Sequence, residues 1–274
     1  MGNAETSPEM TAIKSRMKST WEAGDFGVIA RQTERPGKEF VSRLGILPGM
    51  KVLDVACGTG NTALPAARLG AEVIGVDIAD NLVAQAQERA AQEGLSAKFQ
   101  YGDAEDLEFA DESFDAIVTM FGAMFAPRPD VVVNEFKRVC KSGGLIAMAN
   151  WTPQSFAAQM FKLGGKYVPP PPGITPPVMW GDEETVKQRF SDGIAELKME
   201  RITVTFRFDM HPADVVELFR TYFGPTQVAF SKLDQAGQDS LRAELTELFT
   251  NNNIATDGGT ENKMEYLEVR AIKA

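Results

Sequence analysis

Short apolar segments alternate with amphipathic segments through the middle of the chain, between Lys51 and Asn150. The apolar segments have the length and the bounding residues of buried strands, at 51–56, 72–76, 98–101, 114–120 and 144–150. The segments between them repeat apolar residues at helical spacing, and Asp80 is expected to cap the helix behind the second strand. Regular alternation of this kind is typical of a parallel sheet with helices on its faces.

The chain on either side of this region has a different pattern. Residues 8–47 carry apolar side chains at helical spacing. After Trp151 the alternation stops, and 167–180 is rich in proline, which favours an extended loop. Apolar and polar residues alternate again at 201–209 and around 267–271, which predicts two further strands with two helices between them. We therefore expect one α/β domain with insertions.

The charge of the chain excludes one class of partner. Its 28 basic and 38 acidic side chains give a net charge of -10. An acidic surface repels phosphate backbones and anionic lipid, so we expect neither nucleic acid nor membrane as a partner. No apolar run reaches the ~20 residues needed to cross a bilayer, and we expect a cytoplasmic protein. Residues 1–6 fit the acceptor pattern for N-terminal myristoylation, which we interpret as an ordinary polar tail.

Metal and disulfide chemistry have few candidate residues. The chain has two cysteines, Cys57 and Cys140, and one histidine, His211. Two unpaired thiols indicate a reducing compartment, and no cysteine pair stands at zinc-ligand spacing, so we predict no metal. We interpret His211, directly before a helix-opening proline, as structural and Cys57 as a packing residue.

The strongest chemical signal is the turn that follows the first strand, in Val52-Leu53-Asp54-Val55-Ala56-Cys57-Gly58-Thr59-Gly60-Asn61. Gly58 and Gly60 permit a positive φ and let the backbone approach a ligand, while the next helix offers unpaired N–H groups. A polar ligand is therefore expected here. Gly58, Gly60 and Ala63 also satisfy a dinucleotide-binding spacing, so the turn alone leaves an NAD(P)-dependent oxidoreductase open.

Acidic residues follow the next two strands. Asp77 ends the second strand, about 20 residues beyond the first glycine, where a carboxylate can bind ribose hydroxyls. Asp103 follows the third strand and a glycine, in register with the other two strand ends. We interpret the nearby acids as a solvated loop: Asp106, Glu108, Asp111 and Glu112.

Together these motifs resemble the class I S-adenosylmethionine-dependent methyltransferases, and in particular the C-methyltransferases of ubiquinone and menaquinone biosynthesis. The resemblance covers roughly residues 48–151. It implies a Rossmann-like class I methyltransferase fold, with a seven-stranded, mostly parallel sheet, an antiparallel last strand, flanking helices and a helical lid. It rests on Leu53-Asp54-Val55-Ala56-Cys57-Gly58-Thr59-Gly60, Gly75-Val76-Asp77-Ile78, Gly102-Asp103-Ala104-Glu105, Ser113-Phe114-Asp115, and Arg138-Val139 with Lys141-Ser142-Gly143-Gly144. Two departures are Ala56, where the family often has glycine, and Ser142, where it usually has proline.

The resemblance also implies the cofactor, S-adenosyl-L-methionine, and its product S-adenosyl-L-homocysteine. The turn after the first strand would shape the methionine pocket, Asp77 would bind the ribose with Ile78 packing on the adenine, and Asp103 would accept the adenine amino group. Strand four would end between cofactor and substrate. The predicted cofactor-binding residues are Asp54, Ala56, Cys57, Gly58, Gly60, Asn61, Asp77, Ile78, Asp103, Ala104, Glu105, Met120 and Phe121.

Aromatic side chains outside these motifs indicate the acceptor site. Family resemblance places them above the carboxyl ends of the strands, where they would form an apolar pocket under a lid. The predicted substrate-binding residues are Trp21, Phe26, Phe125, Trp151, Trp180 and Tyr222. We accordingly expect an N-terminal lid at 1–47, a cofactor-binding core at 48–151, and at 152–274 the last two strands with helices and a Pro-rich loop that cap the substrate.

The predicted reaction is methyl transfer to a small molecule. The sulfonium methyl is already activated, so alignment in an apolar pocket can suffice, and no catalytic residue is assigned. Transfer to oxygen, nitrogen and carbon all stay open, as does the oligomeric state. Two alternatives are an NAD(P)-dependent oxidoreductase, against which Asp54 and the lack of a Tyr-x-x-x-Lys motif argue, and a non-catalytic S-adenosylmethionine-binding module.

Overall fold

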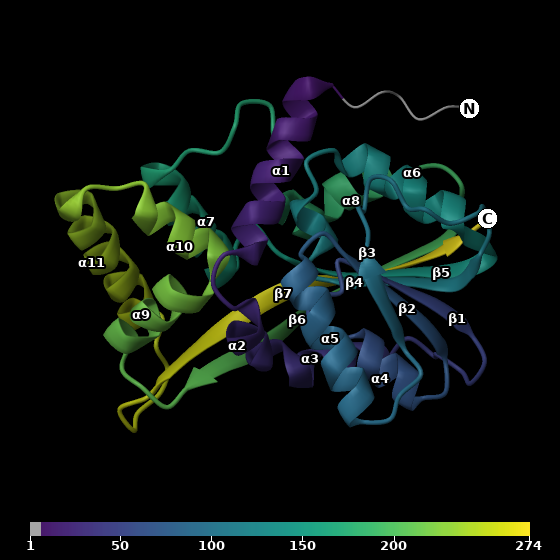
Figure 1. Ribbon diagram of the computed structural model, residues 1–274, viewed down its shortest axis with the longest axis horizontal. Coiled ribbons are helices and arrows are strands. Elements are labelled where there is room, and N and C mark those ends of the chain that lie inside the picture. The colour runs from purple at the N-terminus through teal and green to yellow at the C-terminus, as the bar shows by residue number, and fades with distance from the viewer. Residues whose placement is uncertain (1–6) are drawn as a thin grey trace.

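One sheet of seven strands runs through the computed structural model, which describes residues 7–274 (Figure 1). The strand order is β3-β2-β1-β4-β5-β7-β6. The strands are β1 (Lys51–Val55), β2 (Glu72–Asp77), β3 (Lys98–Tyr101), β4 (Phe114–Met120), β5 (Cys140–Trp151), β6 (Ile194–Phe208) and β7 (Thr260–Lys273). The myristoylation-like pattern at 1–6 lies outside the described residues.

The last strand enters the sheet antiparallel to its neighbours. Strands β1 to β5 pair in parallel, whereas β7 lies between β5 and β6 and is antiparallel to both. This arrangement confirms the predicted fold class. Because the parallel strands share one direction, the ends of β1, β2 and β4 come together at a single edge, where open α/β sheets collect ligands.

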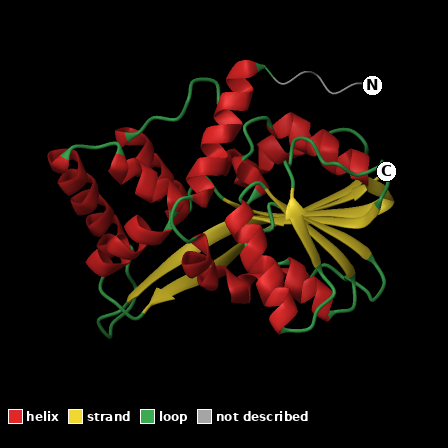
Figure 2. Ribbon diagram, in the orientation of Figure 1, coloured by secondary structure: helices red, strands yellow, loops and turns green. Residues whose placement is uncertain are grey.

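Helices cover both faces of the sheet and gather beyond the carboxyl ends of the strands (Figure 2). Helices α4 and α5 lie on one face and α6 on the other, while the longer β6–β7 ribbon extends beside α9 and α11 (Figure 1). The helices are α1 (Pro8–Glu22), α2 (Phe26–Ala30), η1 (Arg31–Thr33), α3 (Glu34–Ser42), α4 (Ala63–Arg68), α5 (Asp80–Gln92), η2 (Ala123–Phe125), α6 (Pro129–Val139), α7 (Phe156–Tyr167), η3 (Pro177–Gly181), α8 (Glu183–Arg189), α9 (Pro212–Tyr222), α10 (Gly224–Ser231) and α11 (Gln235–Asn251).

The central strands form because their side chains are covered from both sides. Val52, Leu53 and Val55 of β1 have no exposed surface, and Ile117 and Val118 of β4 are equally buried. Strands buried on both faces are nearly continuously apolar, which is the pattern that the sequence carries here. The single acid inside β1 is therefore exceptional and belongs to the site described below.

Four features of the chain differ from the sequence-based expectation. Strand β5 begins at Cys140 rather than at Gly144, because Cys140 pairs with Phe114 across an irregularity in the register. Strand β6 begins at Ile194 rather than near Arg201, because the additional residues pair with β7. Helices α7, α8 and α10 were not predicted. The N-cap of α5 is Ala79, not Asp80, and the Asp77 carboxylate accepts a hydrogen bond from the Ala79 N–H at 2.9 Å.

The N-terminal helices pack against α9 and α10, far along the chain. Gly24 forms an isolated β-bridge with Phe223, and the Asp25 N–H donates to the Tyr222 carbonyl at 3.2 Å. At Gly224, a Cβ would lie 1.9 Å from the Thr20 carbonyl oxygen of α1, so a side chain is excluded there. This contact holds α1 across the edge where the strands end.

Candidate active site

A cavity lies at the carboxyl ends of β1, β2 and β4, between the sheet and helices α1, α2, α7 and α9. The residues predicted to bind the cofactor come from four separate segments of the chain. Those that line the cavity are Ala56, Cys57, Gly58, Asn61, Asp77, Ile78, Asp103, Ala104, Met120 and Phe121. The other three, Asp54, Gly60 and Glu105, lie behind its wall.

Asp77 joins the end of β2 to the Gly-rich turn. Its Oδ2 accepts a hydrogen bond from the Gly58 N–H at 2.8 Å, while Oδ1 accepts from Ala79. Burial raises the pKa of this carboxyl, and the backbone donors oppose that rise. Each carboxylate oxygen has a second lone pair, so Asp77 can accept ribose hydroxyls without releasing the turn.

Asp54 supports the same turn from beneath. Its side chain is completely buried, and the Thr62 hydroxyl donates to Oδ2. Burial raises the pKa of Asp54 to about 7. Within the described residues its Oδ1 has no hydrogen-bond partner, which makes Asp54 the least satisfied acid of the site.

Two non-glycine residues beside the cavity have left-handed backbone conformations. Ala56 has a φ of 54° and Phe121 a φ of 59°, each at the end of a central strand. Gly122, which follows Phe121, lies against Ala56. A Cβ on Gly122 would be 2.4 Å from the Ala56 carbonyl oxygen, so the ends of β1 and β4 are in close contact. Non-glycine residues at positive φ cost roughly 1–3 kcal/mol and cluster at functional sites.

Asn61 lines the cavity, but its side chain is used to hold α2 against the turn. Its Nδ2 donates to the Ala30 carbonyl at 2.7 Å, and its Oδ1 accepts from Arg89 Nη1 at 2.7 Å. The same Arg89 nitrogen donates to the Thr59 carbonyl at 2.7 Å. The methionine end of the predicted site is thus closed by a network between α2, α5 and the turn.

The buried acid beyond β3 is held by a cation. Arg128 donates to Glu105 from its backbone N–H at 2.5 Å and from Nε at 2.8 Å. These two donors of Arg128, together with Lys14 Nζ at 2.7 Å from Oε2, compensate the burial of this carboxylate, whose side chain has no exposed surface. Glu105 therefore shapes the loop that presents Asp103 rather than facing the cavity.

The opposite half of the cavity is aromatic. Trp21 contacts Phe26, Phe125 and Phe223, with ring centroids 5.6, 4.9 and 5.9 Å away. Phe121 and Trp151 stack in parallel, with their centroids 3.5 Å apart. Over the whole cavity, the other aromatic and methionine side chains of the lining are Met17 on α1, Met120 at the end of β4, and Met160, Phe161, Phe206, Phe219 and Met264.

The structure brings four of the six predicted substrate residues to this half: Trp21, Phe26, Phe125 and Trp151. Trp180 is instead buried beneath the Arg189 guanidinium, which lies 4.4 Å from its ring. Tyr222 is replaced in the lining by its neighbour Phe223, because α9 ends between them. Phe161, Phe206 and Phe219 were missed as site residues, since each has the sequence pattern of an ordinary core position.

The remaining titratable candidates lie away from the acceptor half. His211 is exposed at the N-cap of α9, and burial raises the pKa of the Cys57 thiol. Both cysteines are free.

Over residues 7–274, no three His, Cys, Asp or Glu side chains are grouped so that they could hold a metal ion. None of the helices described in that range is long and apolar enough to span a membrane.

Comparison with known proteins identifies the family. A family model described as a methyltransferase domain matches residues 52–144. A phosphatidylethanolamine N-methyltransferase of Cereibacter sphaeroides is 33% identical over 144 residues, which span 52% of this chain and 69% of the relative. The chain belongs to the class I S-adenosylmethionine-dependent methyltransferases. An NAD(P)-dependent oxidoreductase, the rival interpretation of the Gly-rich turn, is thereby set aside.

Two further comparisons extend over most of the methyltransferase. An uncharacterized protein of Mycobacterium tuberculosis is 38% identical over 270 residues, which cover 97% of each chain. The crystal structure of the YcgJ protein from Bacillus subtilis superposes with a TM-score of 0.61 at 20% identity, covering 87% of this chain and 98% of that one. These matches do not single out the ubiquinone and menaquinone enzymes, so that closer resemblance stays a prediction.

The residues of the methyltransferase fit its cofactor. Gly58 has a φ of 52° and faces open space, because a Cβ built on it would meet its nearest atom, Phe26 Cε1, at 4.0 Å. The turn can therefore receive a ligand against its backbone. The ribose hydroxyls and the adenine amino group are hydrogen-bond donors, and Asp77 and Asp103, whose carboxylates are acceptors, both line the cavity.

Proposed function

We propose that the enzyme transfers the methyl group to an apolar small molecule that binds in the aromatic half of the cavity. The observation that supports this proposal is the division of the cavity lining. Its polar side chains lie at the Gly-rich turn, on the neighbouring α2–η1 segment and at the strand ends, whereas the rest of the lining is apolar and consists of rings, methionines and smaller aliphatic side chains. Apolar walls with few polar groups suit a ligand that loses little hydration on binding.

In this proposal each half of the cavity has its own task. Gly58, Asp77 and Asp103 bind the cofactor, which supplies an activated sulfonium methyl group when it is bound. Phe121 and Trp151 form a rigid stacked wall that orients the acceptor. Helices α1 and α2 close over both and exclude water, so alignment and desolvation are what the protein contributes. No general base is assigned, and the acceptor atom stays open among oxygen, nitrogen and carbon.

The similarity to a phosphatidylethanolamine N-methyltransferase supports an acceptor with apolar parts, because that relative is named for a lipid.

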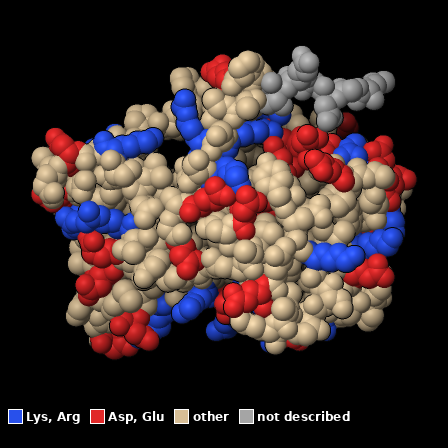
Figure 3. All heavy atoms as spheres, viewed as in Figure 1, with Lys and Arg blue, Asp and Glu red and all other residues tan. Residues whose placement is uncertain are grey.

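Nucleic acid is a poor candidate for the methyl acceptor. On the face shown in Figure 3 acidic and basic side chains are interspersed, and the chain as a whole carries a net charge of -10. We also propose a cytoplasmic location, in which both free thiols stay reduced.

The proposal is tested by following a labelled methyl group. Purified enzyme is incubated with methyl-labelled S-adenosylmethionine and four acceptor pools: lipophilic phenols and quinols, lipophilic amines, hydrophilic metabolites, and nucleic acid. We expect label in a lipophilic pool, and loss of that transfer when Met264 at the cavity wall is replaced by Lys, since a buried unpaired charge disfavours an apolar ligand. Transfer to the hydrophilic or nucleic-acid pool alone would contradict the proposal. Bound cofactor that is never demethylated would instead favour the non-catalytic module.

A further inference from the structure

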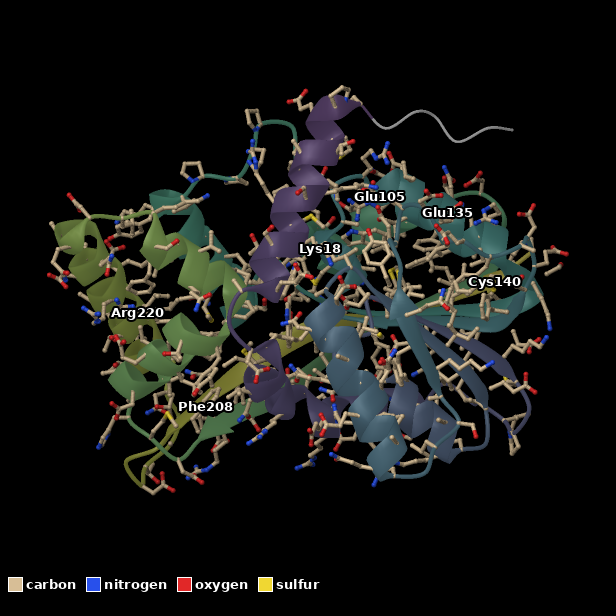
Figure 4. All side chains as sticks on the ribbon, viewed as in Figure 1. Lys18, Glu105, Glu135, Cys140, Phe208 and Arg220 are labelled. Carbon is tan, nitrogen blue, oxygen red and sulfur yellow. The ribbon has the colours of Figure 1, made fainter. Side chains whose placement is uncertain are left out.

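One face of α1 lies over the cavity and its rim. Lys14, Met17, Lys18 and Trp21 follow one another at helical spacing, so their side chains share this face. Met17 and Trp21 line the cavity, whereas the two lysines reach loops at its edge. Figure 4 shows Lys18 on α1 and Glu105 on the neighbouring loop beyond β3.

Lys18 anchors α1 to the loop that follows β2. Its Nζ donates to the Ile78 carbonyl at 2.9 Å and pairs with Asp80 at 2.7 Å. It also pairs with Glu22 of its own helix at 2.6 Å. The backbone of Ile78, whose side chain we predict to pack on the adenine, is therefore held directly by α1.

Lys14 anchors the same helix to the loop that follows β3. Its Nζ lies 2.6 Å from Asp103 Oδ2 and 2.7 Å from Glu105 Oε2. The lysine side chain is 20% exposed and Glu105 has no exposed surface, so this contact is shielded from water and is stronger than a surface pair. One helix is thus tied to both loops that flank the predicted adenine position.

Met17 lies on this face between the two anchors. It lines the cavity together with Ile78, Asp103 and Ala104. A methionine side chain is flexible and polarisable, and it makes favourable contacts with aromatic rings. It can cover a flat purine that Ile78 contacts from the other side.

We propose that α1 forms the roof of the adenine site, with Met17 packed on the ring face opposite Ile78 and with Lys14 and Lys18 as positioning residues. This adds three residues to the predicted cofactor site. It rests on the predicted roles of Ile78 and Asp103, and not on the identity of the acceptor. Because the cofactor lies beneath the helix, both lysine contacts must open before the product can leave.

Adenosine and S-adenosylhomocysteine are the probes that test this roof, by titration calorimetry and by stopped-flow displacement. Met17→Ala should weaken both ligands by the same factor, about 10-fold, while Met17→Leu stays within about 2-fold of the wild type. Lys14→Met with Lys18→Met should release the product about 10-fold faster and lose the salt dependence of release. Lys14→Arg with Lys18→Arg should keep the rate of product release close to that of the wild type, because the charges are kept.

The matched control is Lys187→Met, which removes an exposed lysine paired with Glu184 on α8, away from the cavity. Circular dichroism and thermal unfolding show whether each variant is folded. A folded Met17→Ala protein with unchanged affinity for both probes would overturn the roof. If that variant also has a higher KM for the acceptor, Met17 belongs to the acceptor half of the cavity instead. Neither measurement of probe binding needs an acceptor, so failure of the proposed function would leave the test intact.

Discussion

The two halves of the cavity differ in where they come from and in what they are made of. The cofactor half is built largely from strand ends between Asp54 and Glu105 and uses carboxylates and backbone N–H groups. The acceptor half collects rings from elements as distant in the chain as α1 and α9. The cofactor common to the family is thus bound by short local motifs. The acceptor is bound by side chains that come together only after the chain has folded.

The halves also differ in their response to pH. Burial raises the pKa of both Asp54 and Asp77 in the cofactor half, whereas the described lining of the acceptor half consists of side chains that do not titrate. Charge-dependent effects should therefore be confined to one side of the cavity. The predictions that follow separate the two sides, beginning with the largest expected effect.

Asp54→Asn should remove a pH dependence of stability. The folded protein holds the Asp54 proton up to a pKa of about 7, against an ordinary value of 3.8, so the wild type loses stability as pH rises through this window. A shift of about three units corresponds to about 4 kcal/mol. Denaturant unfolding from pH 4 to pH 8 should show the Asp54→Asn variant gaining stability relative to the wild type by up to that amount.

Asp115→Asn serves as the control for that experiment. Lys141 lowers the pKa of Asp115, so the wild-type carboxylate adds stability above its ordinary range and loses it as pH falls. The difference from wild type should therefore change with the opposite sign and by less, because this pair is partly exposed. A flat difference for Asp54→Asn would show that Asp54 is not held protonated.

Asp77→Ala should act on the cofactor half alone. Loss of charged hydrogen bonds worth roughly 1.5–3 kcal/mol predicts a 10- to 100-fold weaker affinity for S-adenosylmethionine and for its demethylated product. NAD and NADP should not bind to either protein. Calorimetry checks this, with Glu88→Ala on the exposed side of α5 as the control. Equal affinity in Asp77→Ala would remove Asp77 from the site.

Phe125→Ala should act on the acceptor half alone. Phe125 contacts Trp21 and Phe161 edge to face, and losing part of its buried surface should lower kcat/KM for the acceptor by about 10-fold. Cofactor affinity should stay within about 2-fold. Phe109→Ala is the matched control, because Phe109 is half-buried and packs edge to face on Phe114 outside the cavity. Equal losses in both variants would point to general destabilisation.

Removal of metal ions should change neither cofactor binding nor the rate of methyl transfer. The prediction rests on the single histidine, the unpaired cysteines and a family resemblance in which the acids at strand ends bind the cofactor and not a cation. Methyl transfer should proceed at the same rate in excess chelator. If chelator abolished methyl transfer and added magnesium or zinc restored it, the expectation would be wrong.

The parallel strands of the sheet could be predicted from the sequence because the signals for them are local. The parallel strands carry apolar runs. Asp77 ends β2 and Asp103 follows β3 after one glycine, so their common edge could be predicted from the direction of the strands alone. The short helix α10 could not be predicted. It depends on Gly224 fitting against the Thr20 carbonyl of α1, a contact between residues far apart in the chain.

The apolar character of the acceptor half could be predicted from the sequence, but the identity of all its residues could not. Aromatic composition indicated an apolar pocket, yet Trp180 packs beneath Arg189 and Phe223 takes the place expected for Tyr222. Which ring faces a cavity depends on where a helix ends and how it is rotated, and neither is encoded by spacing alone. Lys14 and Lys18 were missed for the same reason, since a lysine on a predicted helix gives no sign of its partner.

The position of β7 has a consequence for the order in which the protein is assembled. Glu268 of this strand is buried and accepts hydrogen bonds from Arg43 at the end of α3, 225 residues earlier. On a ribosome that adds about 5–20 residues per second, Arg43 waits roughly 10–45 s for this partner. Strand β6 must wait as well, because β7 separates it from β5. Helix α3, although it is synthesised before β1 to β7, therefore makes its contact with the sheet through Arg43 only after β7 has been synthesised.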